Sequence, residues 1–205
     1  GTYAQHVTIF RPGTRLAIIG AGQANTTVDA SGASIAFNLD GPYLNVSISG
    51  LTIIGGEDLA IRAHDTKLKL EDALITGTGA GTTPDFYDET IQATRGSVTL
   101  LRSTVRGNPN GGGIHTHDAR VTIVSTTASE NGCPLCKGAV WVGGGQLQLI
   151  DSTVSGNTST GQGGGGIIQG LNNSNACTLT VDSATVTNNT GIKGGGFYVD
   201  NGTAT

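Results

Sequence analysis

The chain has 205 residues, a formal net charge of −4, and 13% charged residues where ordinary globular domains have about 25%. Its 34 glycines are more than double the usual share of about 7%. Without a run of Lys and Arg to neutralise phosphates, or an apolar stretch of roughly 18 residues, we expect no nucleic-acid partner and no transmembrane segment.

The first 78 residues consist of short apolar segments separated by glycines and small polar residues. Gly20-Ala-Gly22 follows the apolar segment Leu16–Ile19, as in a dinucleotide-binding loop, but no third glycine comes three residues later and no helical pattern follows. We interpret it as the corner of a coil. Val46–Ile53 and Leu68–Ile75 are two degenerate copies of a phrase that becomes regular further along the chain.

Residues 79–89 form an insertion that is rich in aromatic and acidic side chains, including Asp85 and Tyr87. Insertions in repeat proteins map to loops, and these loops tend to cluster on the binding face. We therefore count Asp85 and Tyr87 among the candidate ligand-binding residues.

From residue 98 onward one phrase occurs four times. It consists of an apolar pair two residues apart, a small polar corner, a short β-branched piece and an asparagine. The copies are Val98–Asn108, Val121–Asn131, Leu147–Asn157 and Leu179–Asn189. Their closing asparagines are 23, 26 and 32 residues apart, which indicates a fixed frame with variable insertions. Such spacing is typical of a solenoid.

Strands this short, alternating in polarity and without a helical stretch between them, can bury their apolar side only by stacking on the next copy. The sequence therefore predicts an all-β parallel β-helix. We expect the four residues that open the phrase to form one internal ladder: Val98, Val121, Leu147 and Leu179. Asparagine suits the corner because it tolerates left-handed backbone angles and because identical asparagines can stack as a ladder.

The whole chain, residues 1–205, is expected to form a single β-helix domain that is a segment of a longer protein or a stacking subunit. It begins at Gly1, contains no methionine and shows no amphipathic helix or polar cap at either end. An uncovered β-helix end exposes unpaired backbone groups that invite pairing. We therefore expect copies to associate end to end, as filaments if the contact does not close into a ring.

Three cysteines leave an odd count, with Cys133 and Cys136 in an inserted loop and Cys177 in a later insertion. A redox motif would need a βαβ pattern, and a zinc site would need further ligands at matching spacing. We instead predict a small surface disulfide between Cys133 and Cys136, with Cys177 free or buried. A disulfide of this kind indicates a secreted or cell-surface protein.

The opening coils resemble the first coils of secreted right-handed parallel β-helix proteins of the pectate-lyase-like superfamily. The Gly-Gly-Gly-Ile and Thr-Val-x-x-Asn units are similar to the repeats of bacterial surface β-helix proteins, including polymorphic outer-membrane proteins. The resemblance covers essentially the whole chain and implies a right-handed coil of about 22–32 residues. It is weak for activity, since the superfamily includes lyases, epimerases, hydrolases and adhesins.

One outward stripe could carry chemistry. Seven residues before each repeat's first apolar position lies an inward column formed by Ile61, Ile91, Ile114 and Val140. The residues one and three further on then point outward, and the next turn follows them. These outward positions are Arg62, Gln92, His115 and Trp141; then His64, Thr94, His117 and Gly143; then Asp65, Arg95 and Asp118. Because adjacent coils lie roughly 4.8 Å apart, we expect one exposed patch.

Such a patch suits a sugar polymer, with Trp141 for a pyranose face, Arg for a uronate carboxylate and His as a base. The catalytic candidates are His64, His115, His117, Arg62 and Arg95, and the binding candidates are Trp141, Gln92 and Asp118 together with Asp85 and Tyr87. No cofactor is implied. Two His in a His-x-His pattern are usually two solvated side chains, so we assign no metal site.

Two functions fit these observations. The first is an extracellular or cell-surface scaffold or adhesin that associates end to end and binds carbohydrate. The second is a polysaccharide lyase or C5-epimerase acting on uronate-containing polymers. His64-Asp65 and His117-Asp118 resemble only loosely the motif of alginate epimerases, and neither the Asp clusters of calcium-dependent pectate lyases nor the paired acids of polygalacturonases are present. We favour the scaffold. The repeats are most regular in coils 4 to 7, whereas a specialised active site should make the coils that carry it irregular.

Overall fold

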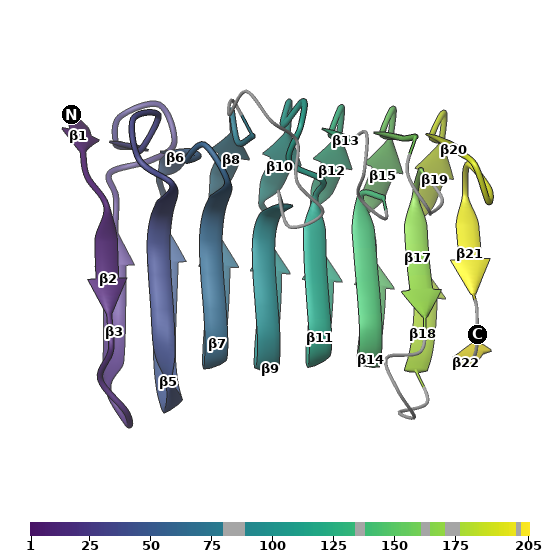
Figure 1. The fold of residues 1–205 in the computed structure, drawn as a ribbon, viewed down its shortest axis with the longest axis horizontal. Coiled ribbons are helices and arrows are strands. Elements are labelled where there is room, and N and C mark those ends of the chain that lie inside the picture. Colours follow the sequence, from purple (N-terminus) through teal and green to yellow (C-terminus); the bar gives the residue numbers. More distant parts are fainter. Residues whose placement is uncertain (80–88, 134–137, 161–164, 171–176, 200–201) are drawn as a thin grey trace.

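The computed structural model describes residues 1–79, 89–133, 138–160, 165–170, 177–199 and 202–205. These residues form an all-β parallel solenoid of about 7 turns, which confirms the predicted fold class. Figure 1 shows the coils stacked side by side along the long axis of the molecule. The described part contains strands and turns but no helix, and so no helix that could span a membrane.

The coils build three parallel sheets. The short sheet contains β1 (Thr2–Ala4), β4 (Thr27–Asp29), β6 (Thr52–Ile54), β8 (Leu74–Thr76), β10 (Thr104–Arg106), β12 (Thr127–Ser129), β15 (Thr153–Ser155) and β19 (Thr185–Thr187). The long sheet contains β2 (Val7–Ile9), β5 (Ile35–Ser49), β7 (Leu59–Glu71), β9 (Glu89–Leu101), β11 (Ile114–Val124), β14 (Val140–Ile150), β17 (Ile167–Gly170) and β21 (Phe197–Val199), and also β3 (Arg15–Ile19), β18 (Cys177–Asp182) and β22 (Gly202–Ala204). A small third sheet contains β13 (Gly132–Cys133), β16 (Thr158–Ser159) and β20 (Thr190–Gly191).

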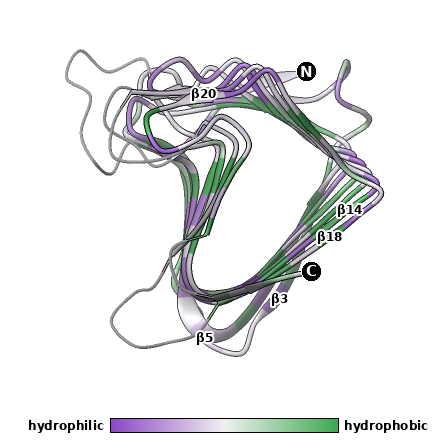
Figure 2. Cartoon of the chain, turned by 90° about the vertical axis from the view of Figure 1, so that its right-hand side faces the viewer, coloured by the Kyte–Doolittle hydropathy of each residue, from purple (hydrophilic) through white to green (hydrophobic). Residues whose placement is uncertain are grey.

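The central strands of the long sheet are longer than the sequence suggested, because each joins two expected strands into one bent strand. In each of β5, β7, β9, β11 and β14 one residue with positive φ lies at the bend, and in β5, β9 and β14 a nearby glycine (Gly41, Gly96 or Gly145) has positive φ as well. We call these five residues the first corner: Tyr43, Asp65, Arg95, Asp118 and Gly144, with φ of 62°, 51°, 53°, 51° and 79°. The first arm of each strand precedes this corner and the second arm follows it. Seen along the long axis, the coils superimpose closely (Figure 2).

A second corner follows the second arm in every coil from β7 onward. It consists of Asp72, Arg102, Ser125, Asp151 and Ser183, which also have positive φ, between 46° and 52°. Left-handed backbone at non-glycine residues is uncommon, and short polar side chains are the ones that adopt it most readily. Polar residues therefore occupy the bends because they tolerate the geometry and remain solvated.

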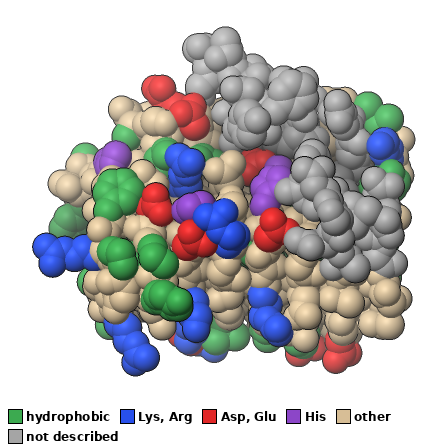
Figure 3. Space-filling model, turned by 60° about the horizontal axis from the view of Figure 1, so that its bottom comes forward, with side chains coloured by type: hydrophobic (Ala, Val, Ile, Leu, Met, Phe, Trp, Pro, Cys, Tyr) green, Lys and Arg blue, Asp and Glu red, His purple; other side chains and the backbone are tan. Residues whose placement is uncertain are grey.

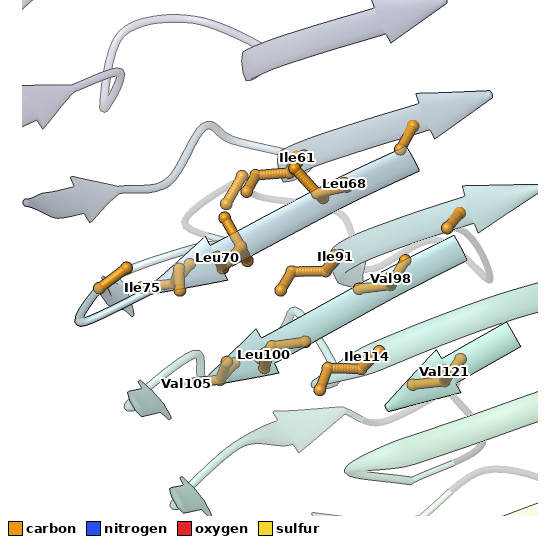
Figure 4. Close-up of a cluster of buried hydrophobic side chains, with 14 of the residues drawn as sticks. Ile61, Leu68, Leu70, Ile75, Ile91, Val98, Leu100, Val105, Ile114 and Val121 are labelled. Atoms are coloured by element: carbon orange, nitrogen blue, oxygen red, sulfur yellow. The ribbon is translucent and has the colours of Figure 1, made fainter. Parts of the chain in front are cut away.

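The predicted internal ladders are confirmed by the register. Val98 pairs with Val121, Val121 with Leu147, and Leu147 with Leu179, and all four are at most 2% exposed. The first-arm column is equally regular and buried: Ile61, Ile91, Ile114 and Val140. Figure 4 shows how Ile61, Ile91 and Ile114, and likewise Leu68, Val98 and Val121, lie in rows across neighbouring coils. Paired residues are 22 (Val46 and Leu68) to 32 (Leu147 and Leu179) positions apart, as expected for the coil length.

The closing asparagines of the repeat form a ladder inside the solenoid. The Nδ2 groups of Asn108, Asn131 and Asn157 donate to the Oδ1 atom of the next asparagine at 2.7, 3.0 and 2.8 Å, ending at Asn189. The positive φ at this bend belongs to the preceding residue in each coil: Gly107, Glu130, Gly156 and Asn188. The prediction that the asparagines themselves adopt left-handed angles is therefore wrong, whereas the predicted ladder is confirmed.

A second polar ladder was not foreseen. After the second corner, the backbone N–H groups of Ala73, Ser103 and Thr126 donate to the hydroxyl of the next coil at 3.2, 3.2 and 3.1 Å, the last acceptor being Ser152. The three hydroxyls in turn donate to the carbonyl two residues earlier in their own chain. At the bend these buried N–H groups have no partner in the sheets, and the hydroxyls of the next coil provide their hydrogen-bond acceptors.

Replacing Asn131 with Ala should lower the free energy of unfolding by about 3 kcal/mol, because it leaves the Asn108 amide and the Val105 carbonyl without their buried partner. Urea denaturation measures the change. Asn45→Ala is the control, because Asn45 is exposed on β5 and should change stability by no more than about 0.5 kcal/mol. Equal losses in the two variants would contradict a stabilising role for the ladder.

Candidate functional site

The two predicted outward columns exist in the predicted register. Arg62, Gln92, His115 and Trp141 are neighbours across β7, β9, β11 and β14, and so are His64, Thr94, His117 and Gly143. Asp65, Arg95 and Asp118 follow at the first corner. Figure 3 shows His, acidic and basic side chains gathered on one face of the molecule. The stacking of coils thus brings together groups that are distant in sequence.

Exposure separates these residues into two groups. Arg62, Arg95 and Asp118 are exposed, and His64, Gln92 and His117 are half-buried. His115 is 8% exposed and Trp141 is 6% exposed. The prediction of one exposed patch is therefore wrong for His115 and Trp141, although both occupy the predicted column.

The buried group is an aromatic cluster on the outside of the first arms. The Trp141 ring packs edge-on against His115 and His117, with ring centroids 4.0 and 4.6 Å away, and the two imidazoles stack at 4.9 Å. The indole also lies over Gly143, where a Cβ atom would come within 2.0 Å of it. Trp141 therefore folds along its own strand into space that only glycine leaves open. It packs against the site and does not offer a broad exposed surface to a sugar.

Glu89 is a functional candidate that the sequence did not single out. It opens β9, is 1% exposed, and forms an ion pair through Oε1 with Nδ1 of His115. Its partner in the previous coil is the buried Leu59, so an acid occupies a position that is apolar one coil away. Burial of a carboxylate is costly unless it is paired. The contact with His115 explains how Glu89 is accommodated, and only the mixed composition of the 79–89 insertion hinted at it.

The exposed group is organised around Arg95. Its Nε and Nη2 atoms donate to the two carboxylate oxygens of Asp65 at 2.7 and 2.8 Å, and Nη2 also lies 2.6 Å from Nε2 of His64. A guanidinium has only donors, so Nε2 must accept the bond and Nδ1 must carry the ring hydrogen. Nδ1 in turn lies 3.0 Å from Oδ1 of Asp40. The geometry thus holds His64 as a neutral imidazole oriented by Asp40.

The second corner of the same strand carries a near-copy of this arrangement. Arg102 donates to both oxygens of Asp72 at 2.9 Å and to Oε1 of Glu71 at 2.6 Å. Both arginines have positive φ, and both pair with an aspartate one coil away that has positive φ itself. In this copy a carboxylate takes the place that His64 has at the first corner. A corner arginine can therefore be held by carboxylates alone, and the imidazole at the first corner is an additional feature.

The ion pairs fix the charges of the carboxylates. Hydrogen bonding to Arg95 lowers the pKa of Asp65 below its ordinary value of 3.8, and Arg102 lowers the pKa of Asp72 in the same way. The pKa of Glu71 is also lowered, first by Lys69 and then by Arg102. Asp65 raises the pKa of Arg95. All these groups are therefore charged at neutral pH.

Several predicted residues cannot be placed. Asp85, Tyr87 and Cys136 lie outside the described residues, and the side chain of Cys133, at the end of β13, does too, so the predicted disulfide stays a prediction. Cys177 is buried, and its Sγ accepts a hydrogen bond from the Gly144 N–H at 3.1 Å. Within the described ranges, no three His, Cys, Asp or Glu side chains are grouped so that they could hold a metal ion.

Comparison of the chain with protein-family models, with curated proteins and with solved structures found no match. The parallel β-solenoid is therefore established by the structure itself. The resemblance to the pectate-lyase-like superfamily rests on the coil pattern alone.

Acid should weaken the Asp65 and Asp72 pairs. A carboxylate whose folded pKa is lowered contributes stability that is present above its unfolded pKa and is lost as the pH falls through the folded value. We therefore expect the free energy of unfolding to fall between about pH 5 and pH 2, with a shallower slope in Asp72→Asn. Denaturant unfolding at several pH values measures the slopes.

The matched control is Asp151→Asn. Asp151 has the same second-corner position and a φ of 47°, but no ion pair among the described residues involves it. Asparagine tolerates the left-handed backbone at both positions. If Asp72→Asn and Asp151→Asn flattened the pH dependence equally, the Arg102 pair would not be its source.

Proposed function

We propose that the chain is a β-solenoid scaffold of an extracellular or cell-surface protein, and that it binds an acidic polysaccharide on the first-corner face. We define this face by Arg62, His64, Asp65, Arg95, His117 and Asp118. The observation that carries the proposal is the network of Asp40, His64, Asp65 and Arg95, which presents an oriented neutral imidazole and a guanidinium at the surface of three successive coils.

The arrangement suits an extended chain with many hydroxyl groups. Successive coils repeat about every 4.8 Å, so donors and acceptors recur along the solenoid axis. The carboxylates of Asp40 and Asp65 can accept hydrogen bonds from sugar hydroxyls, since each oxygen has more than one acceptor position. Arg62 is exposed and takes part in none of the ion pairs among the described residues. Its planar guanidinium matches the geometry of a uronate carboxylate.

Secretion, display on a cell surface and end-to-end association of copies stay predictions. The described exposed large hydrophobic residues other than Tyr43 lie in the first and last coils: Tyr3, Phe10, Leu16, Ile19, Ile192, Phe197 and Val199. Within the part of the chain that the structure describes, the middle coils therefore expose few large apolar side chains. A repetitive middle region of this kind is consistent with a scaffold that presents a binding face along its length.

A second candidate function is that of a polysaccharide lyase or C5-epimerase, and the pairing of His64 with Asp40 favours it. Both reactions begin with removal of the proton next to the uronate carboxylate. If Arg95 turned from His64 to that carboxylate, it would neutralise the developing charge and release the Nε2 lone pair to take the proton. Asp40 would hold the ring and stabilise the imidazolium that forms. A lyase then breaks the bond to the leaving sugar oxygen, whereas an epimerase returns a proton to the opposite face.

Arg95→Ala and His64→Ala should each weaken binding of a uronate polymer at least tenfold, measured by calorimetry with size-defined oligomers of several polyuronates. Arg102→Ala is the matched control, because it removes the same kind of cross-coil pair at the second corner and should leave the affinity unchanged. Equal affinities in Arg95→Ala, Arg102→Ala and the unaltered protein would contradict the proposal.

The catalytic alternative has its own measurement. Incubation with polyuronates should yield an unsaturated product that absorbs in the ultraviolet if the protein is a lyase, and deuterium uptake from heavy water if it is an epimerase. His64→Ala should abolish either signal, since it removes the base. Binding without product or exchange would leave the scaffold function and exclude the catalytic one for the polymers used.

A further inference from the structure

We infer that Tyr43 forms a sugar-stacking subsite at one edge of the first-corner face, and that a bound glycan runs along the solenoid axis across the coils. This inference rests on the proposed function. It adds an aromatic platform that neither the repeat pattern nor the predicted stripe contains. Three features of the structure carry it: an insertion in β5, the backbone conformation of Tyr43 and a hollow beside its ring.

The insertion interrupts an otherwise regular pairing. Asp40 pairs with His64 and Leu44 pairs with Thr66, so β5 has three residues, Gly41, Pro42 and Tyr43, where β7 has only Asp65. The Gly13 N–H donates to the Pro42 carbonyl at 3.0 Å, which fixes the insertion against the first coil. Bulges of this kind redirect side chains and often lie beside functional sites. Here the bulge contains Tyr43, which is 83% exposed.

The backbone of Tyr43 is unusual for its residue type. Its φ is 62°, and the other non-glycine residues with positive φ in the described chain are Asp, Arg, Ser, Glu and Asn. A bulky ring is disfavoured there, since it gains nothing from the local hydrogen bonds that short polar side chains can make. Its exposed ring also buries almost no apolar surface in return. A residue that costs stability and does not pack needs an explanation outside the fold.

A hollow of about 310 Å³ lies beside the ring, lined by Pro42, Tyr43, Asp65, Lys67 and Gly96. Gly96 borders this hollow, and close packing of the coils requires glycine there, because a Cβ atom would come within 2.3 Å of the Thr66 carbonyl oxygen. The walls therefore combine an aromatic face, a carboxylate and an ammonium group. This combination suits a sugar ring, whose C–H face packs on an aromatic and whose edge carries hydroxyl groups.

The charges in the hollow favour a sugar with an anionic group. Lys67 is exposed and takes part in none of the ion pairs among the described residues, whereas Asp65 is held by Arg95. An acidic sugar on Tyr43 could therefore place its anionic group near the Lys67 ammonium. Asp65 borders the hollow and also belongs to the Arg95 network, so the two places are contiguous. A glycan that occupies both must cross from β5 to β7 and β9, along the axis.

Tyr43→Gly separates a functional role from a structural one. Glycine adopts positive φ freely, so the variant should unfold at a higher temperature than the unaltered protein, while its affinity for an acidic oligosaccharide should fall at least tenfold. Tyr43→Phe keeps the ring and should retain affinity within about twofold. Tyr3→Ala removes a comparably exposed ring from the short sheet and is the control, with unchanged affinity.

The possible outcomes are distinct. A lower unfolding temperature for Tyr43→Gly, or unchanged affinity in that variant, would overturn the subsite. If Arg95→Ala lost binding while Tyr43→Gly kept it, the proposed function would stand and the subsite would not. If Tyr43→Gly lost binding while Arg95→Ala kept it, the subsite would stand without the Arg95 network. Lys67→Gln should weaken binding of the acidic oligosaccharide and leave a neutral one of equal length unaffected; equal effects on both would overturn the assignment of Lys67.

Discussion

Parallel backbone pairing in a single register is the interaction on which the rest of the structure depends. β11 pairs without a shift to β9 on one side and to β14 on the other, so every residue lies beside its counterpart in the next coil. A slip by one residue would turn the inward ladder outward. Apolar residues, asparagine amides, hydroxyls and arginine–carboxylate pairs therefore stack in columns across the coils, although Glu89 beside Leu59 departs from this pattern. The repeated phrase in the sequence is the consequence of this constraint.

The same constraint builds the candidate site. Asp40, His64 and Arg95 are 24 and 31 residues apart in sequence, yet their side chains form one chain of hydrogen bonds. Coils can differ in length without moving these groups, because the extra residues lie in the connections outside the paired arms. Lengthening such a loop also has only a small entropic cost. A solenoid can thus vary its insertions while it keeps a polar constellation on one face.

The sequence predicted what depends on register and missed what depends on local packing. Columns such as Ile61 to Val140 and Arg62 to Trp141 could be counted, since the period of a strand is two. The burial of Trp141 could not be predicted from this periodicity. It depends on the missing side chain at Gly143 and on the direction in which the indole ring turns along its own strand. The bulge at Gly41–Tyr43 was not predicted either. A two-residue insertion at a corner keeps the inward and outward alternation of both flanking arms unchanged, so the sequence pattern does not reveal it. Glu89 was hidden because its apolar counterpart, Leu59, gave no reason to expect a buried acid.

Comparison of the two arginines, Arg95 at the first corner and Arg102 at the second, distinguishes what the fold uses from what the candidate site adds. Arg102 with Asp72 and Glu71 shows how a corner arginine is held between two coils when its partners are both carboxylates. At the first corner His64 replaces one of these carboxylates, so Arg95 loses a charged partner and gains a neutral acceptor, which is the weaker interaction. The fold does not require this loss, and nothing in the pairing of β7 with β9 changes between the two corners. Departures from the locally favourable choice are expected where a protein meets a ligand. The imidazole at His64 is therefore better explained by what it presents to the outside than by what it contributes to the coil.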